Sequence, residues 1–146
     1  MTSTEMIPAW VEGQLIPVEK LAVHQRGLRH KAVSVFVLSP RGILIQQRAM
    51  AKYHTPGLWA NTCCTHPLWD EPDATCATRR LAEDLGITGL SLQPAGGVEY
   101  RAEVGGGLVE HEVVALFRAG RFSLGEREFR AFYDASLQRL LCGLQP

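Results

Sequence analysis

Two carboxylates, Glu110 and Glu112, stand two residues apart in the otherwise apolar segment LVEHEVV. Successive side chains of a β-strand point to opposite faces. We therefore expect Glu110 and Glu112 to share one face of this strand, and Val109, His111 and Val113 to share the other. Like charges on one face repel each other unless a cation or solvent lies between them. This strand alone leaves two interpretations open, a cation site and a solvated edge.

Three histidines make the cation site the more informative hypothesis. His24, His30 and His66, together with Glu110 and Glu112, would offer three imidazoles and two carboxylates. Such a set of nitrogen and oxygen ligands suits Mn²⁺, Mg²⁺ or Zn²⁺ better than metals that prefer thiolates. The spacing does not by itself bring these residues together. Taken alone, His24 and His30 would more often be surface residues.

A second pattern surrounds a helix that is predicted to begin with Pro72 at its first position and to end at Gly86. Its charged residues follow the register of the Nudix box, G-x5-E-x7-R-E-U-x-E-E-x-G-U, where U is a bulky apolar residue. A charged helix face without further function is the alternative, and it explains this register less well. The matching residues are Thr65, Glu71, Arg79, Arg80, Leu81, Glu83, Asp84, Gly86 and Ile87.

The departures from that box change its chemistry. Thr65 replaces the first Gly, Arg80 replaces a Glu, and Asp84 replaces the last Glu. A Nudix hydrolase relies on clustered carboxylates to bind metal ions and to help activate water. Arg80 removes one negative charge from that cluster and adds a positive one, and arginine pairs well with phosphate oxygens. The pattern therefore predicts a helix that binds a diphosphate but cleaves it poorly.

Together these stretches resemble the type I isopentenyl diphosphate isomerases, a branch of the Nudix fold. The resemblance covers roughly residues 8 to 118, and the combination of NTCCTHP with the downstream ExE strand is its most specific part. The matching segments are PVEKLAVH, RHKAVSVFVLSPRGILIQQRA, KYHTPGLWANTCCTHP, RRLAEDLGI and EYRAEVGGGLVEHEV.

The resemblance implies a role for each site residue. Cys64 matches the catalytic cysteine, with Cys63 as its structural neighbour, and Glu112 matches the catalytic carboxylate, assisted by Tyr100. The implied metal site, for Mn²⁺ or Mg²⁺ (or Zn²⁺), consists of His24, His30, His66, Glu110 and Glu112. Positions that meet the diphosphate or its surroundings are Lys20, Arg48, Lys52 and Arg80, and Asp84 stands where a Glu helps to bind a second ion, Mg²⁺, at the diphosphate.

The implied reaction converts isopentenyl diphosphate into dimethylallyl diphosphate by shifting a double bond. It requires protonation of the terminal alkene carbon and removal of a proton from C2. Water would capture the intervening tertiary carbocation, so the pocket must be dry. Proton donor and acceptor must lie on opposite sides of the flat substrate, each within hydrogen-bond reach. Two alternatives remain, a Nudix-type diphosphate hydrolase and a catalytically impaired diphosphate-binding relative.

The elements that must position these residues predict an α+β fold with Nudix-like mixed β-sheets. From residue 31 the sequence predicts a hairpin, AVSVFVL and ILIQQ joined by a Pro-Gly turn, and then a long ordered loop or short strands over residues 49 to 69. The central helix buries a modest apolar stripe of Cys76, Ala77, Leu81 and Leu85. Further strands are expected at Leu90 to Gln93, Val98 to Val104 and Leu108 to Phe117, followed by a C-terminal helix over 126 to 141.

The segment from 121 to 146 has no match in the isomerase family. That family places a Trp over the carbocation, whereas the last Trp here is Trp69. A cation over a desolvated indole gains about 2 kcal/mol, or roughly 30-fold in rate. Phe129, Phe132 or Tyr133 could supply a replacement ring, although core residues of the C-terminal helix are the simpler interpretation.

Bulk properties predict a single domain over residues 1 to 146. The 15 basic and 15 acidic residues cancel, which argues against a nucleic-acid partner. We see no signal peptide and no apolar run long enough to cross a bilayer, and therefore expect a cytoplasmic protein with a small-molecule substrate.

A disulfide framework is not expected among the four cysteines. Small buried side chains explain Cys76 and Cys142, but explain Cys63 or Cys64 less well beside His66 in a polar loop. The oligomeric state is left open.

Overall fold

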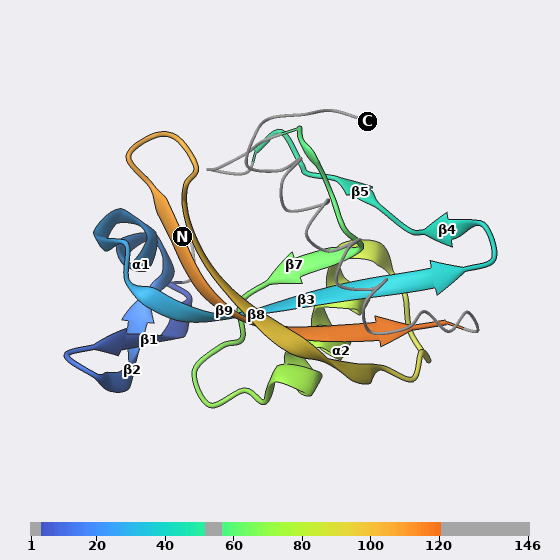
Figure 1. Cartoon of the computed structure of the whole chain (residues 1–146), viewed down its shortest axis with the longest axis horizontal. Helices are drawn as coiled ribbons and strands as arrows, with labels where there is room; N and C mark the ends of the chain where they lie inside the picture. Colours follow the sequence, from blue (N-terminus) through green and yellow to red (C-terminus); the bar gives the residue numbers. More distant parts are fainter. Residues whose placement is uncertain (1–3, 52–56, 121–146) are drawn as a thin grey trace.

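A computed structural model of the chain describes residues 4–51 and 57–120. Along the chain its elements are β1 (Met6–Val11), β2 (Gln14–Glu19), α1 (Lys20–Arg26), β3 (Arg29–Ser39), β4 (Gly42–Ile43), β5 (Gln46–Gln47), β6 (Trp59–Ala60), β7 (Cys63–Thr65), α2 (Asp73–Leu85), β8 (Gln93–Glu103) and β9 (Val109–Ala119). The main sheet has the order β2-β1-β3-β9-β8, and β4 and β7 also pair with β3 (Figure 1). Because β3 and β9 run parallel while the other paired strands run antiparallel, the sheet is mixed and the predicted α+β class is confirmed.

Strand β3 organises the centre of this sheet. On one edge it pairs with β9, which sets His30 opposite Glu112. On the other edge it pairs with β1 and then with β7, which sets Ser34 opposite Cys64. Paired residues share a face, so His30, Ser34, Cys64 and Glu112 all point to the same side of the sheet, here named the site face.

Two apolar clusters lie on the two faces of the sheet. On the site face, one cluster consists of Ala32, Phe36, Leu38, Val114 and Leu116. Helix α2 packs against the opposite face, here named the α2 face, where the second cluster consists of Val33, Val35, Cys63, Phe117 and, from the helix, Cys76, Ala77 and Leu81. The predicted stripe of α2 and the buried environment of Cys76 are thereby confirmed, while Cys142 lies outside the described residues.

The boundaries of α2 follow from local chemistry. Pro72 is the N-cap residue, so the helix begins at Asp73, one residue later than predicted. Gly86 ends it in the left-handed region at φ 66°. The Gly86 N–H donates to the Ala82 carbonyl oxygen at 3.0 Å, and the Ile87 N–H donates to the Leu81 carbonyl oxygen at 3.2 Å. A residue without a Cβ adopts this conformation at little cost, which explains the stop at Gly86.

The predicted hairpin is confirmed, because β3 and β4 pair through Leu38 with Ile43 and through Ser39 with Gly42. The separate strand expected at Leu90 to Gln93 is wrong. A single strand, β8, begins at Gln93 and runs through the region expected at Val98 to Val104. The glycines of PAGG resemble a turn, but a register shift between Pro94 and Gly97 accommodates them within the strand.

Several expectations concern residues at the ends of the described region. The predicted C-terminal helix, including Phe129, Phe132 and Tyr133, lies outside the described residues. The N-terminal unit of β1, β2 and α1 was not predicted. Its signal is the turn at Glu12 and Gly13, both at positive φ, between two apolar runs. Within the described residues no helix has the length and apolar character needed to cross a membrane.

Candidate active site

Three buried histidines from three different segments meet on the site face. His24 lies in the last turn of α1, His30 in β3, and His66 directly after β7. Their ring centroids are 4.9, 5.0 and 5.2 Å apart. His24 and His30 are fully buried, so the expectation that they are surface residues is wrong.

Backbone contacts orient the three rings in the same way. The Nδ1 atoms contact the carbonyl oxygens of Lys20 (2.7 Å, His24), Leu28 (2.7 Å, His30) and Lys31 (3.3 Å, His66). A carbonyl oxygen only accepts, so each Nδ1 carries the proton and each Nε2 keeps its lone pair. Burial lowers the pKa of His24, and burial together with the neighbouring imidazoles lowers that of His66 well below its usual value. A neutral imidazole binds a metal ion through the lone pair of one ring nitrogen.

Glu112 completes this group. One ligand atom from each of His24, His30, His66 and Glu112 lies within 4.8 Å of the others. Glu112 Oε1 is 3.7 Å from Nε2 of both His30 and His66, too long for a hydrogen bond. Two ligands that are each about 2.1 Å from one ion lie roughly 3 to 4 Å apart. Within the described residues His30 Nε2 makes no hydrogen bond. These four residues therefore fit a divalent metal ion.

Glu110 lies beside this group without being one of the four. The Tyr100 hydroxyl is 3.0 Å from Glu110 Oε2 and 2.8 Å from Glu112 Oε2, and so links the two carboxyl groups. Burial, followed by the charge of Glu112, raises the pKa of Glu110 to about 7. The two glutamates share the site face as predicted, and they are only 5% and 8% exposed, so the solvated-edge interpretation is wrong.

The two neighbouring cysteines point to opposite faces of the sheet because they occupy successive positions of β7. Cys63 lies opposite Val35 and is fully buried in the apolar cluster on the α2 face. Cys64 lies opposite Ser34 on the site face. Of the two alternatives for residues 49 to 69, a long loop or short strands, the short strand is confirmed for both cysteines, which lie in β7. Burial raises the pKa of Cys64 to about 12, so its thiol keeps its proton near neutral pH.

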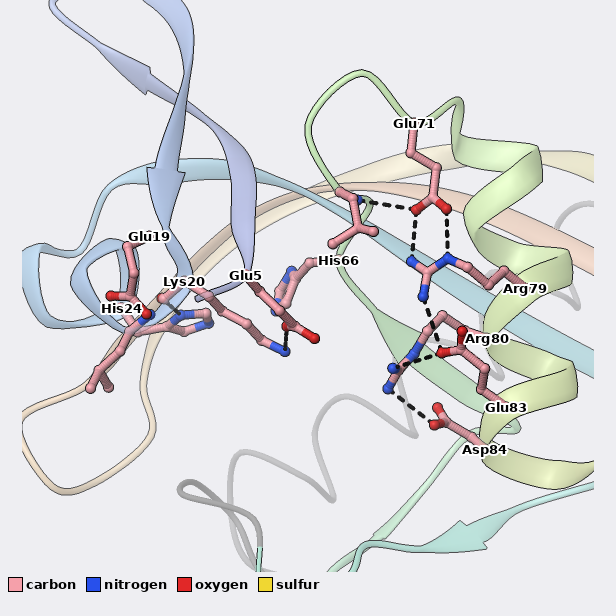
Figure 2. A network of polar contacts seen from close by, with 12 residues as sticks. Glu5, Glu19, Lys20, His24, His66, Glu71, Arg79, Arg80, Glu83 and Asp84 are labelled. Carbon is pink, nitrogen blue, oxygen red and sulfur yellow. Dashed lines mark hydrogen bonds and ion pairs between the residues drawn. The ribbon is translucent and has the colours of Figure 1, made fainter. Parts of the chain in front are cut away.

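The polar residues of the predicted box pair with one another along α2 (Figure 2). Arg79 donates two hydrogen bonds to Glu71, at 2.6 and 2.7 Å, and one to Glu83 at 3.1 Å. Arg80 lies 3.2 Å from Glu83 and 3.0 Å from Asp84. Each of these three carboxylates therefore has an arginine partner in place of a cluster of carboxylates alone. Asp84 also accepts from Cys63 Sγ at 3.8 Å and is not in the histidine group.

The predicted substrate-binding cations lie in two places. Lys20 Nζ pairs with Glu5 at 2.9 Å, and in the view of Figure 2 this pair lies between His24 and the Arg80 side chain of α2. The charges of Lys20, Arg80 and Arg79 all lower the pKa of Glu5, in agreement with that placement. Burial raises the pKa of Cys64 and of Glu110, and the positive charge of Arg48 opposes both shifts, as expected for a cation near these two side chains. Lys52 lies outside the described residues.

Two side chains at the site were not predicted from the sequence. Ser34 lies four residues after His30 on the same face of β3, and its Oγ is 3.3 Å from Cys64 Sγ. Asn61 is buried and accepts a hydrogen bond from the same sulfur. The spacing of Ser34 and the place of Asn61 at the start of NTCCTHP could have indicated both.

Comparison with known proteins places this geometry in a family. The model of the NUDIX domain family matches residues 28–132, which contain β3, the Nudix-box residues of α2 and both glutamates of β9. The chain belongs to the NUDIX domain family. Two solved structures agree in fold: DR0079 from Deinococcus radiodurans (TM-score 0.62, 12% identity, 82% of this chain and 74% of that one) and a MutT protein from Methanosarcina mazei Go1 (TM-score 0.52, 18% identity, 66% of this chain and 67% of that one).

The chain is also similar in sequence to curated proteins named isopentenyl-diphosphate Delta-isomerase. It is 69% identical over 116 residues to one from Cereibacter sphaeroides (strain KD131), covering 80% of this chain and 66% of that protein. The identity is 67% over 115 residues to the protein from Dinoroseobacter shibae and 64% over 115 residues to that from Rhodobacter capsulatus. Each match covers 79% of this chain and 65% of the relative. The resemblance seen in the sequence is confirmed. The chain spans slightly under two thirds of the length of these relatives.

Proposed function

We propose that this chain interconverts isopentenyl diphosphate and dimethylallyl diphosphate by protonating one carbon and deprotonating another. The observation that carries the proposal is that Cys64 and Glu112, from strands on the two edges of β3, point to the same face of the sheet. Glu112 there belongs to the buried histidine group. The names of the relatives at 64 to 69% identity support the same reaction.

His24, His30, His66 and Glu112 would hold the metal ion, with Glu110 joining them through a modest side-chain rearrangement. Mn²⁺ or Mg²⁺ (or Zn²⁺) suits this nitrogen and oxygen donor set. Bound there, the ion would supply a fixed positive charge beside the Glu112 carboxylate. Glu110 and Glu112 are crowded and buried, and a bound cation would reduce the repulsion between their carboxylates.

Cys64 and Glu112 form the proposed acid–base pair. The Cys64 thiol is protonated near neutral pH and can therefore donate a proton to an alkene carbon. The Tyr100 hydroxyl holds Glu112 Oε2 at 2.8 Å, which fixes the orientation of the carboxyl group. Burial of the surrounding side chains keeps water from a carbocation formed between the two groups.

Four cations would bind the diphosphate. Arg80, Lys20, Arg48 and Lys52 are the proposed contacts. Lys20 and Arg80 each have a carboxylate partner, Glu5 and Asp84, at 2.9 and 3.0 Å. The oxygens of a bound diphosphate would attract Lys20 and Arg80 away from, or in addition to, these carboxylates. Asp84 would then be available to the Mg²⁺ ion of the diphosphate.

Hydrolysis of a diphosphate is the less favoured function for this site. Glu71, Glu83 and Asp84 are all engaged by Arg79 or Arg80, so the helix presents ion pairs where a hydrolase presents free carboxylates. A catalytically impaired relative would still bind the diphosphate but release no product. Both possibilities are separate outcomes of the experiment below.

Incubation of the chain with labelled isopentenyl diphosphate, Mg²⁺ and Mn²⁺ tests the proposal. We expect an acid-labile allylic product, and no phosphate release from nucleoside diphosphate compounds. Phosphate release without allylic product would establish the hydrolase instead. Binding of isopentenyl diphosphate with neither product would establish the impaired relative.

The remaining expectations stay predictions. They are a single domain over residues 1 to 146, a cytoplasmic location, a small isoprenoid diphosphate as the partner, and no nucleic-acid partner.

A further inference from the structure

The buried side chain of Asn61, two residues before β7, has all its polar atoms engaged in hydrogen bonds. Its Nδ2 donates to the carbonyl oxygens of Val35 and Cys63, each at 3.0 Å. Its Oδ1 lies 2.6 Å from Cys64 Sγ. Asn61 is 4% exposed, so water does not compete for these contacts. The two main-chain acceptors fix the orientation of the carboxamide, because a flipped group would set its oxygen against both carbonyls.

This orientation determines the direction of the thiol proton. A carboxamide oxygen only accepts hydrogen bonds, so Cys64 must be the donor in its contact with Asn61. The thiol has one proton, and the Ser34 hydroxyl 3.3 Å away must therefore donate to the sulfur. The Cys64 sulfur therefore makes two hydrogen bonds: it accepts one from Ser34 in β3 and donates one to Asn61.

We propose that Asn61 is a positioning residue for Cys64, which holds the sulfur on the site face and keeps its proton directed at a fixed acceptor until a substrate arrives. Its contribution to turnover rests on the proposed isomerase function. Its effect on the thiol does not, because the contacts exist without substrate. An error of about 1 Å in the place of a reacting group costs on the order of 100-fold in rate.

The S–H stretching vibration of Cys64 tests the effect on the thiol directly. The band is isolated by subtracting the infrared spectrum of Cys64→Ala from that of the full chain. We expect a band below the wavenumber of a thiol without a hydrogen bond, and a shift to higher wavenumber in Asn61→Ala. An unshifted band in Asn61→Ala would overturn the proposal. If Asn61→Ala does not fold, the wild-type spectrum alone tests the proposal. An S–H band at the wavenumber of a thiol without a hydrogen bond would then overturn the proposal.

Thr62→Val is the matched control. Thr62 is fully buried in the same segment and also links main-chain groups, accepting from Val37 N at 2.9 Å and donating to Leu44 O at 2.6 Å. Its contacts do not include Cys64. We expect its loss to leave the S–H band in place, whereas a shift equal to that of Asn61→Ala would mean that general loosening of the segment, and not Asn61, moves the thiol.

Kinetics then test the contribution to turnover. Asn61→Ala should lower kcat for isopentenyl diphosphate by about 10- to 100-fold with little change in KM, while Thr62→Val should leave kcat nearly unchanged. A shifted band with unchanged kcat would overturn the catalytic role. If the wild-type chain does not turn over isopentenyl diphosphate, the proposed function fails, and the vibrational result still decides whether Asn61 positions the thiol.

Discussion

Single residues of the site face differ sharply from their neighbours in sequence, and the two cysteines are the clearest case. The Cys64 side chain contacts Asn61 and Ser34 among the polar groups of the site. The Cys63 side chain packs among Val33, Val35 and α2 on the other face. Adjacent residues of the same type therefore have different environments because of strand alternation alone.

Cys64→Ala and Cys63→Ala form a matched pair for testing this difference. We expect Cys64→Ala to abolish isomerisation in a folded protein. Cys63→Ala should keep most of the activity and lose about 1 kcal/mol of unfolding free energy, because it opens a small cavity in an apolar cluster. Product formation by both variants and their urea unfolding curves are the measurements. Equal loss of activity in both would remove the assignment of Cys64.

The metal group makes a second prediction at this scale. A divalent ion that binds the folded state at 100 times its dissociation constant adds about 2.7 kcal/mol, or roughly 8 °C in Tm for a domain of this size. We expect Mn²⁺ to raise Tm by this order and a chelator to reverse the rise. His66→Gln should lose the effect, whereas His111→Gln should retain it, because His111 lies on the other face of β9.

A Tm that is independent of Mn²⁺ in the wild-type chain, or a rise that survives His66→Gln, would contradict the proposed ligands.

The sequence predicted those features of the site that depend on residues close together in the chain. The period of two along a strand was enough to set Glu110 and Glu112 on one face. The burial of His24 and His30 could not be predicted, because it results from the packing of α1 and β3 against the loop after β7. For Asn61 only part of the environment is local: its side chain contacts Cys63 and Cys64 nearby in the chain, whereas its contact with the Val35 carbonyl oxygen, 26 positions away, depends on the pairing of β3 with β7.

Among the elements of residues 4–51 and 57–120, β3 determines the site, because it alone there pairs with both strands that carry the proposed acid–base pair. The parallel pairing of β3 with β9 was beyond the sequence, since apolar runs predict strands but not their partners or direction. The long strand β8 was divided in two by its glycines. In the structure Gly97 lets β9 approach closely, since a Cβ there would lie 2.9 Å from the Val114 carbonyl oxygen.

Helix α2 is anchored to the preceding loop by the pair of hydrogen bonds between Arg79 and Glu71. The Glu71 side chain is 11% exposed and the Arg79 side chain 27%. We expect Glu71→Gln to lower the unfolding free energy by about 1 to 2 kcal/mol, because it breaks a bidentate, largely buried ion pair. Glu83→Gln is the control, since the Glu83 side chain is 49% exposed and a surface pair contributes little. Urea denaturation measures both, and equal effects would contradict the anchoring role of Glu71.

For the whole molecule, the described residues combine a NUDIX fold with a helix whose box carboxylates are paired with arginines, and with a thiol and a carboxyl group on the opposite face of the sheet. In the proposed function, these features separate binding of a diphosphate from its cleavage. They leave proton transfer at carbon as the chemistry that the site face favours.

Turnover of isopentenyl diphosphate in D₂O tests this central claim most directly. The exchangeable proton of the donor is then a deuteron, so two separate groups for protonation and deprotonation should place one deuterium in the methyl group of dimethylallyl diphosphate that derives from the terminal alkene carbon. Proton NMR of the product measures this incorporation. Allylic product without deuterium in that methyl group would contradict the account, because the proton would then have moved within the substrate without exchange through Cys64 and Glu112.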